Sequence, residues 1–176
     1  MSETLDIASL AAAPYKAMIA LDRSITLEVR LRHLLKIRAS QINGCAFCID
    51  MHWKDARAAG ETEERLYMLS AWSESAEYTD REKAALELCE AMTLIATSHM
   101  PEEVWRHASS HFNQEELAQL IFAITAINAW NRVAITSGVE SGHYKPQAQN
   151  APALLEGTPC AGGTARRARV ANRFSG

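Results

Sequence analysis

Residues 26–60 read TLEVRLRHLLKIRASQINGCAFCIDMHWKDARAAG and contain two consecutive helical patterns. In the first pattern, apolar residues recur at a spacing that places them on one face of a helix. These residues are Leu27, Leu31, Leu34, Leu35 and Ile42. We expect this helix to run from about Thr26 to Asn43 and Gly44, because glycine commonly follows the end of a helix. A second helix should begin at the cysteine pair and end at Gly60.

Helix start signals recur along the chain. Thr62 is placed to cap a short helix over residues 63–71. Thr79 and Glu82 have the spacing of a capping box, and the apolar stripe of the helix that follows consists of Ala85, Leu88, Met92 and Ile95. Pro101 suits the first residue of another helix. Strand and hairpin signals are scarce, so the sequence predicts an all-α fold.

The last predicted helix spans residues 114–138. Asn113 should cap it, Glu116 should complete a capping box, and Phe112 should pack on Leu117. This helix is apolar nearly all round, which is typical of a helix at the centre of a bundle or between subunits. Asn128 and Asn131 interrupt the apolar surface, so they argue against a membrane span and require polar partners inside the protein. Apolar surface of this extent also predicts self-association.

Glycine and proline divide the chain at about residue 146. Residues 1–145 hold six of the 13 glycines and prolines, and the much shorter segment 146–176 holds the other seven. We therefore expect one helical domain over residues 1–145 and a solvated, weakly ordered tail over residues 146–176, which carries several arginines. An arm that clasps a partner subunit is the alternative interpretation of the tail.

The composition excludes several classes of protein. Hydrophobic residues make up 48% of the chain and charged residues 22%, which is enough apolar matter for one substantial core. The net charge is -3 and no basic stripe with interleaved aromatics occurs in the domain, so nucleic acid is not an expected partner. The N-terminus lacks a signal-peptide pattern and no run of about 18 apolar residues exists, which predicts a cytoplasmic protein without a membrane partner.

The spacing C-x-x-C-x-x-x-H joins Cys45, Cys48 and His52. If Cys45 lies in the first turn of a helix, the three side chains share one face. A helix N-terminus stabilises a thiolate, and a nearby imidazole can accept the thiol proton. Two sulfurs three residues apart can close a disulfide, which traps a sulfenic acid before further oxidation. The pattern therefore indicates a two-cysteine peroxidase.

A zinc site is one alternative for the same residues, with His52 as third ligand and His33 or another residue as fourth. His33 lies 12 residues before Cys45, and an antiparallel helix pair would return it to the cysteines as a second proton carrier; a partly exposed helix histidine is the simpler interpretation. We interpret the histidines at 99, 107 and 111 as surface or structural residues and Cys89 as an inert core cysteine. Trp53 is interpreted as a packing residue, and a place in the wall of a peroxide channel is the alternative.

Residues 37–52, together with the later run of residues 126–132, resemble the alkylhydroperoxidase AhpD-like family of the carboxymuconolactone decarboxylase superfamily. The resemblance implies a helical bundle assembled as a homotrimer or homohexamer that reduces hydrogen peroxide or organic hydroperoxides. It also implies that peroxide oxidises Cys48, that Cys45 resolves the product, and that His52 belongs to a proton relay. His33 occupies the position of a relay glutamate in that family. A histidine that titrates near neutral pH would still pass protons there.

The leading hypothesis is therefore a peroxidase with Cys48, Cys45, His52 and His33 in catalytic roles and with no cofactor or bound metal. An external dithiol must reduce the disulfide, and the family resemblance implies one of the lipoyl type. One rival is a lactone decarboxylase of the same superfamily, which would not need the cysteines. The other is a non-enzymatic module that is stabilised by zinc or that senses redox state.

Overall fold

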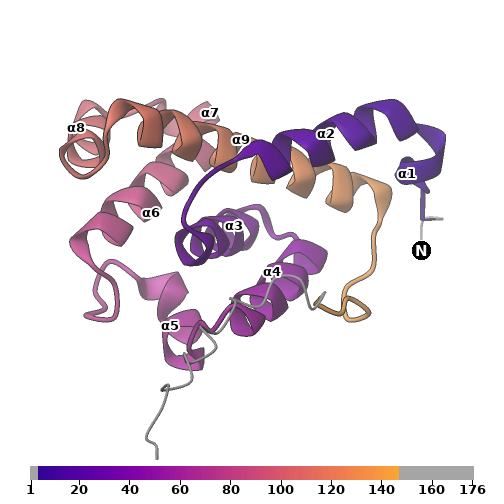
Figure 1. The fold of residues 1–176 in the computed structure, drawn as a ribbon, viewed down its shortest axis with the longest axis horizontal. Helices are drawn as coiled ribbons and strands as arrows, with labels where there is room; N and C mark the ends of the chain where they lie inside the picture. The colour runs from indigo at the N-terminus through magenta and orange to yellow at the C-terminus, as the bar shows by residue number, and fades with distance from the viewer. Residues whose placement is uncertain (1–3, 147–176) are drawn as a thin grey trace, which may run out of the picture.

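A computed structural model describes residues 4–146, which form helices and no strand (Figure 1). The helices are α1 (Ile7–Leu10), α2 (Ala12–Ser24), α3 (Val29–Asn43), α4 (Ala46–Ala58), α5 (Glu63–Met68), the 3-10 turn η1 (Leu69–Ala71), α6 (Asp80–Thr93), α7 (Ile95–Ser98), α8 (Glu102–His111) and α9 (Gln114–Ser137). The predicted all-α class is confirmed. The predicted tail falls outside the described residues after its first position, so its boundary stays a prediction.

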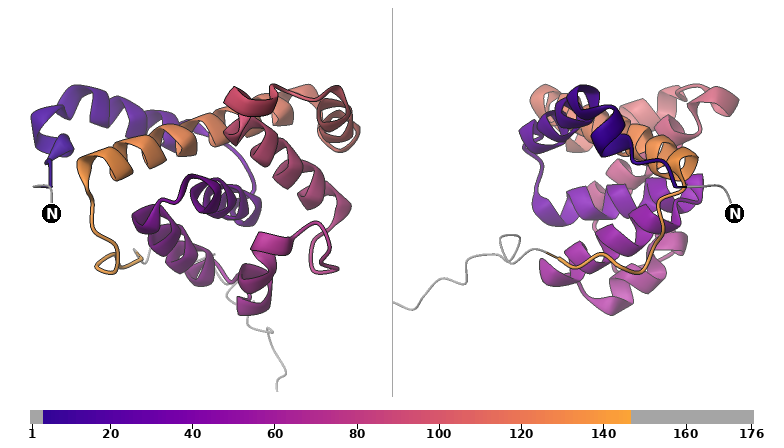
Figure 2. Two further views of the ribbon diagram at one scale, coloured as in Figure 1. Left: turned by 180° about the vertical axis from the view of Figure 1, so that it is seen from behind. Right: turned by 90° about the vertical axis from the view of Figure 1, so that its right-hand side faces the viewer.

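Helix α3 lies at the centre of the molecule, with α4, α6 and α9 packed around it (Figures 1 and 2). Its Leu34, Leu35 and Ile37 side chains are fully buried. Removal of side chains of this size from water stabilises the fold by about 1.5–3 kcal/mol each. The hydrophobic core therefore fixes α3, and α3 positions the start of α4 that follows it.

The predicted start of α3 was wrong by three residues. The Glu28 carboxylate caps the helix by accepting hydrogen bonds from the Arg30 and Leu31 backbone N–H groups, whereas the Thr26 N–H donates to Gln119 of α9 at 2.8 Å. The predicted end is confirmed, because Gly44 ends α3 in the left-handed conformation, with φ at 70°. Helix α4 ends two residues before the glycine at position 60.

The other helix signals were mostly correct. Thr62 caps α5, and capping boxes begin α6 and α9 at Thr79 and Asn113. Pro101 is wrong by one position: its backbone is extended, so it caps α8 instead of forming its first residue. Ile95 was also misplaced, because α6 ends at residue 93 and Ile95 begins α7 as an exposed side chain.

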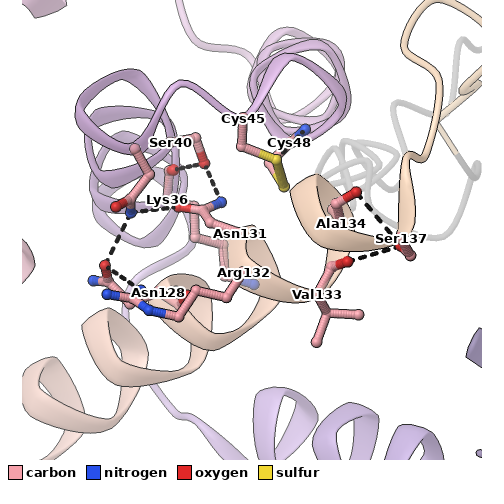
Figure 3. The surroundings of a disulfide bond; sticks show 11 residues. Lys36, Ser40, Cys45, Cys48, Asn128, Asn131, Arg132, Val133, Ala134 and Ser137 are labelled. Carbon is pink, nitrogen blue, oxygen red and sulfur yellow. Dashed lines mark hydrogen bonds between the residues drawn. A yellow bond between two sulfur atoms is a disulfide. The ribbon is translucent and has the colours of Figure 1, made fainter. Parts of the chain in front are cut away.

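The asparagines of α9 find the polar partners that the sequence required (Figure 3). The Asn43 side chain donates hydrogen bonds to the oxygens of both Asn128 and Asn131, each at 2.9 Å. Asn131 in turn donates to the Ser40 hydroxyl at 3.0 Å, and Asn128 donates to the Thr93 hydroxyl at 3.1 Å. These bonds join α3, α6 and α9 inside the core, next to the cysteine pair.

Candidate active site

Cys45 and Cys48 are joined by a disulfide bond at the start of α4 (Figure 3). Cys45 is the N-cap residue of α4, one position before the first turn in which the sequence placed it. Its Sγ accepts a hydrogen bond from the Cys48 backbone N–H at 3.3 Å. The sulfur of Cys45 therefore occupies the position where the unpaired N–H groups of a helix stabilise negative charge.

The turn between α3 and α4 holds this arrangement in place. The positive φ of Gly44 reverses the chain, which lets the Cys45 N–H donate to the Ser40 carbonyl at 3.0 Å. The Ser40 hydroxyl donates to the Lys36 carbonyl one turn earlier and accepts from Asn131. Backbone and side-chain bonds thus fix the cysteine pair against both α3 and α9.

A cavity of about 220 Å³ opens beside Cys48. Cys48 and His52 both line it, whereas Cys45 does not. Its other walls come from α2, α3, α4 and α9, and are formed by Tyr15, Ile19, Asp22, Arg23, Lys36, Phe47, Met51, Trp130 and Ala134. Both cysteines are only 1% exposed, so access to the disulfide runs through this cavity and reaches Cys48.

His33 and His52 meet behind the cavity, with ring centroids 6.3 Å apart. Both are buried, so the interpretation of His33 as a partly exposed histidine is wrong. The Nδ1 atom of each ring is buried and has no hydrogen-bond partner within residues 4–146. Burial, with added repulsion from Arg32 and Lys36, lowers the pKa of His33 from its ordinary value of 6.5 to about 4. Burial likewise lowers the pKa of His52 well below its ordinary value.

These shifts correct one expectation. His33 does not titrate near neutral pH in the disulfide form of the protein, because the fold keeps both imidazoles neutral there. A neutral imidazole is a proton acceptor, which is the form that a general base requires. Protonation of either ring therefore needs a compensating negative charge close by.

Asp55, which the sequence analysis missed, is the group placed to supply such a charge: burial raises the pKa of its carboxyl, and the hydrogen bond from Tyr144 counters that rise. Its Oδ2 atom lies 4.0 Å from the His52 Nδ1 atom, and its Oδ1 atom accepts a 2.7 Å hydrogen bond from the Tyr144 hydroxyl. Asp55 follows His52 by three residues on α4, so helical spacing was a usable signal for it. Tyr144 lies beyond α9, and no local pattern connects it to the site.

The structure bears on the alternative of a zinc site. Potential ligand atoms of His33, His52 and Asp55 lie within 4.8 Å of one another, and neither cysteine belongs to this group. The neutral imidazoles and the carboxylate suit a divalent cation. However, Lys36 and Arg32 repel positive charge at these rings, and one Asp55 oxygen is already bonded to Tyr144. The arrangement fits proton transfer better than cation binding.

Other sequence candidates lie elsewhere. Trp53 packs against the hydrophobic core, which agrees with its interpretation as a packing residue. It lines a different hollow from the one beside Cys48, so the alternative role in a peroxide channel was wrong, and Trp130 lines the cavity instead. Cys89 is fully buried and its pKa is raised to about 12 by burial, which agrees with an inert core cysteine. His107 pairs with Glu87 of α6 at 2.7 Å on the surface, a partner that its local sequence did not indicate.

Comparison with known proteins identifies relatives of the chain. Residues 9–91 match the carboxymuconolactone decarboxylase family. The uncharacterized protein YdfG of Bacillus subtilis (strain 168) is 51% identical over 107 residues, which cover 61% of this chain and 73% of YdfG.

Solved structures give the same result. A protein of unknown function from Agrobacterium tumefaciens, proposed to be the antioxidant defence protein AhpD, is 38% identical, with a TM-score of 0.77 over 81% of this chain and all of that one. An uncharacterized peroxidase-related protein from Ralstonia eutropha JMP134 with an alkylhydroperoxidase AhpD core shares the fold at 18% identity, with a TM-score of 0.66 over 77% of this chain and 75% of that one. The chain therefore belongs to the carboxymuconolactone decarboxylase family and, within it, to the AhpD-like proteins.

Proposed function

We propose that the protein is a thiol-dependent peroxidase that reduces hydrogen peroxide or organic hydroperoxides for antioxidant defence. The observation that carries the proposal is a Cys45–Cys48 disulfide with Cys48 on a cavity that it shares with His52. Membership of the AhpD-like proteins agrees with it. The rival decarboxylase hypothesis gives no role to this sulfur pair.

The oxidative half-reaction begins with the reduced cysteines. His52 accepts the proton of the Cys48 thiol, and the thiolate attacks one peroxide oxygen while the O–O bond breaks. Cys48 becomes a sulfenic acid, and the departing oxygen takes the proton from His52 to leave as water or an alcohol. The Cys45 thiolate then attacks the Cys48 sulfur and expels hydroxide, which is protonated to water and leaves the disulfide.

The reductive half-reaction requires an external dithiol, for which a lipoyl-type group is a candidate. Its thiolate reaches Cys48 through the cavity, because Cys45 does not line that cavity. Attack on the Cys48 sulfur breaks the disulfide and releases Cys45 as a thiolate, which the N-cap position and the Cys48 N–H stabilise. The second thiol of the reductant then displaces Cys48 and carries away the oxidised product.

His33 serves in this scheme as a second proton carrier behind His52. Its ring stands next to His52 and is kept neutral by burial, so it can take a proton that His52 releases. Lys36 and Asp22 line the cavity and contact each other at 2.6 Å. Lys36 opposes a positive charge on both rings, whereas Asp22 favours a positive charge on His33. In the proposed relay, the His33 imidazole therefore takes the place of a glutamate.

Homo-oligomerisation, as a trimer or hexamer, is part of the proposal. Phe122 and Ile135 of α9 are about half exposed, at 53% and 50%. Trp105 of α8 is also exposed. A second copy of the chain would remove such apolar surface from water.

A reducing cytoplasm would supply the dithiol. No helix among residues 4–146 is long and apolar enough to cross a membrane.

The Cys48→Ser variant tests the proposal. Purified reduced protein should consume peroxide in the presence of a dithiol such as dihydrolipoamide and lose two thiols per molecule. Cys48→Ser should lose essentially all turnover because it lacks the attacking sulfur, whereas Cys89→Ser, which changes a buried thiol outside the cavity, should keep it. Normal turnover by Cys48→Ser would refute the mechanism.

Two further measurements address the rivals. Near-stoichiometric zinc that is lost together with the fold on chelation would favour the zinc-stabilised module. Decarboxylation of a carboxylated lactone that survives thiol alkylation would favour the decarboxylase. The peroxidase hypothesis expects neither result.

A further inference from the structure

The segment of residues 139–146, here called the strap, returns from the end of α9 to α4 (Figure 2). Two contacts that involve its backbone fix it there. The Gly142 N–H donates to the Asp50 carboxylate at 3.1 Å, and the Lys54 ammonium donates to the Tyr144 carbonyl at 3.1 Å. These contacts join the strap to successive turns of α4 on the side that carries Asp55.

The strap delivers one side chain to the proton-transfer site. The Tyr144 hydroxyl donates to Asp55 Oδ1 at 2.7 Å, while Asp55 Oδ2 lies 4.0 Å from the His52 Nδ1 atom. The Asp55 side chain is 9% exposed and the His52 side chain 7%. A phenol that bonds one carboxylate oxygen orients the other, so Tyr144 controls where the negative charge of Asp55 stands relative to the imidazole.

We propose that Asp55 and Tyr144 are positioning residues, in which Tyr144 holds the Asp55 carboxylate against His52 so that the imidazolium formed by proton transfer from Cys48 is stabilised. This inference rests on the proposed function, because it assigns a role to groups around the same histidine. The separation of 4.0 Å suits the resting state, in which His52 is neutral. The attraction tightens when the imidazole becomes charged.

The charges around His52 make a carboxylate necessary at this place. Lys36 and Arg32 of α3 both oppose a positive charge on His52, and His33 adds to that opposition when protonated. Asp22 of α2 accepts hydrogen bonds from the Lys36 ammonium with both carboxylate oxygens, at 2.6 and 2.8 Å, so its negative charge is paired with Lys36. Asp55 is the carboxylate that lies within ion-pair distance of the ring.

The test measures the pH dependence of iodoacetamide alkylation of Cys48 in reduced protein. The background carries Cys45→Ser and Cys160→Ser, which replace the resolving cysteine and the cysteine within residues 146–176. Cys48 is then the thiol on the cavity, Cys89 stays buried in the core, and serine suits the N-cap position of α4. Iodoacetamide reacts with the thiolate, so the midpoint of the plot of alkylation rate against pH gives the apparent pKa of the Cys48 thiol. That midpoint reports how well His52 and its partners support proton transfer. Tyr144→Phe should move the midpoint up by about one pH unit, because it removes the hydrogen bond that holds the Asp55 carboxylate beside His52. Asp55→Asn should move it further.

Two control variants distinguish the effect of the Tyr144 hydroxyl from the effect of loosening the strap and from the effect of removing a phenol elsewhere. Asp50→Asn weakens the Gly142 contact and the ion pair with Lys54, which holds the Tyr144 carbonyl, but it keeps the Tyr144 hydroxyl in the protein. Tyr67→Phe removes another phenol-to-carboxylate bond, to Glu63 on the surface. Neither should shift the midpoint. Circular dichroism should show that each variant keeps the helical fold.

The inference fails if Tyr144→Phe leaves the midpoint unchanged, or if Asp50→Asn shifts it equally, since the position of the strap would then be the cause. The proposed function fails independently, if the unmodified protein consumes no peroxide with any dithiol. A shifted midpoint in a protein without turnover would support the positioning role and reject the peroxidase.

Discussion

Two groups in this protein each contain two neighbouring histidines and one carboxylate, yet their surroundings differ. The inner group consists of His33, His52 and Asp55 and is buried between α3 and α4. The outer group consists of two histidines of α8, His107 and His111, with ring centroids 5.2 Å apart, and Glu87 of α6. In the outer group, His107 Nδ1 contacts the carboxylate directly at 2.7 Å in an exposed position.

The difference lies in desolvation and in access to a reactive atom. Water solvates the outer group, so its ion pair changes the free energy of unfolding little. In the inner group, burial disfavours the charged imidazole, and His52 shares its cavity with Cys48. The same residue types therefore serve as a surface contact in one place and as a candidate proton relay in the other.

The largest expected effect comes from His52→Gln. Glutamine keeps a polar side chain but cannot accept and return a proton, so peroxide turnover should fall by roughly 10²–10⁴-fold, the usual contribution of a general base. Steady-state peroxide consumption with a fixed dithiol measures this loss.

His107→Gln is the matched control for that comparison and should change turnover by less than about twofold, because its ion pair is exposed and solvated. Equal losses in the two variants would mean that the buried site is not where the chemistry occurs. The contrast between the two groups would then have no bearing on catalysis.

A second prediction concerns the free energy of unfolding as a function of pH. The pKa of His33 is lowered by burial from 6.5 to about 4, so the unfolded chain binds a proton between these pH values and the folded chain does not. The contribution of His33 to the free energy of unfolding should thus be complete above pH 6.5 and should be lost as the pH falls toward 4. At 1.36 kcal/mol per pKa unit, the loss from this residue should be roughly 3 kcal/mol. Urea denaturation of the disulfide form at several pH values measures the slope.

His33→Gln removes the titrating group and should flatten the slope between pH 6.5 and 4, leaving the part that His52 contributes. His107→Gln, from the outer group, should keep the acid-side fall. Parallel curves for His33→Gln and the unmodified protein would show that His33 is not held neutral by the fold.

The features of the fold that the sequence predicted correctly are those that depend on residues close together in the chain. Capping at Thr79 and Asn113 and the left-handed glycines at 44 and 138 depend on residues a few positions apart, so they were predicted correctly. The start of α3 was missed because Glu28 competes with Thr26 for the cap, and a tertiary bond to Gln119 decides between them. Such a bond joins residues 93 positions apart and has no local pattern.

The same distinction applies to the site. The spacing of Cys45, Cys48 and His52 was a local signal on one helix, and the distance of 12 residues from His33 to Cys45 indicated that an antiparallel helix pair would bring His33 back to the cysteines. Tyr144 reaches Asp55 across 89 positions of sequence, so only the folded chain brings them together. The pKa values were also beyond the sequence, because the burial that lowers them arises when α3 packs against α4.

The smallest expected effect tests the outer group. Glu87→Gln removes the carboxylate that His107 contacts, and exposed pairs of this kind contribute about 0.2–1 kcal/mol to the free energy of unfolding. We expect a loss within that range by urea denaturation at pH 6, and about 0.5 M salt should reduce the difference further, since salt screens exposed charges but not buried ones. A loss of more than about 2 kcal/mol that persists in salt would mean that this pair anchors α8 to α6. Exposure would then no longer separate the two histidine groups, and the assignment of the relay to the inner one would depend on its cavity and on Cys48 alone.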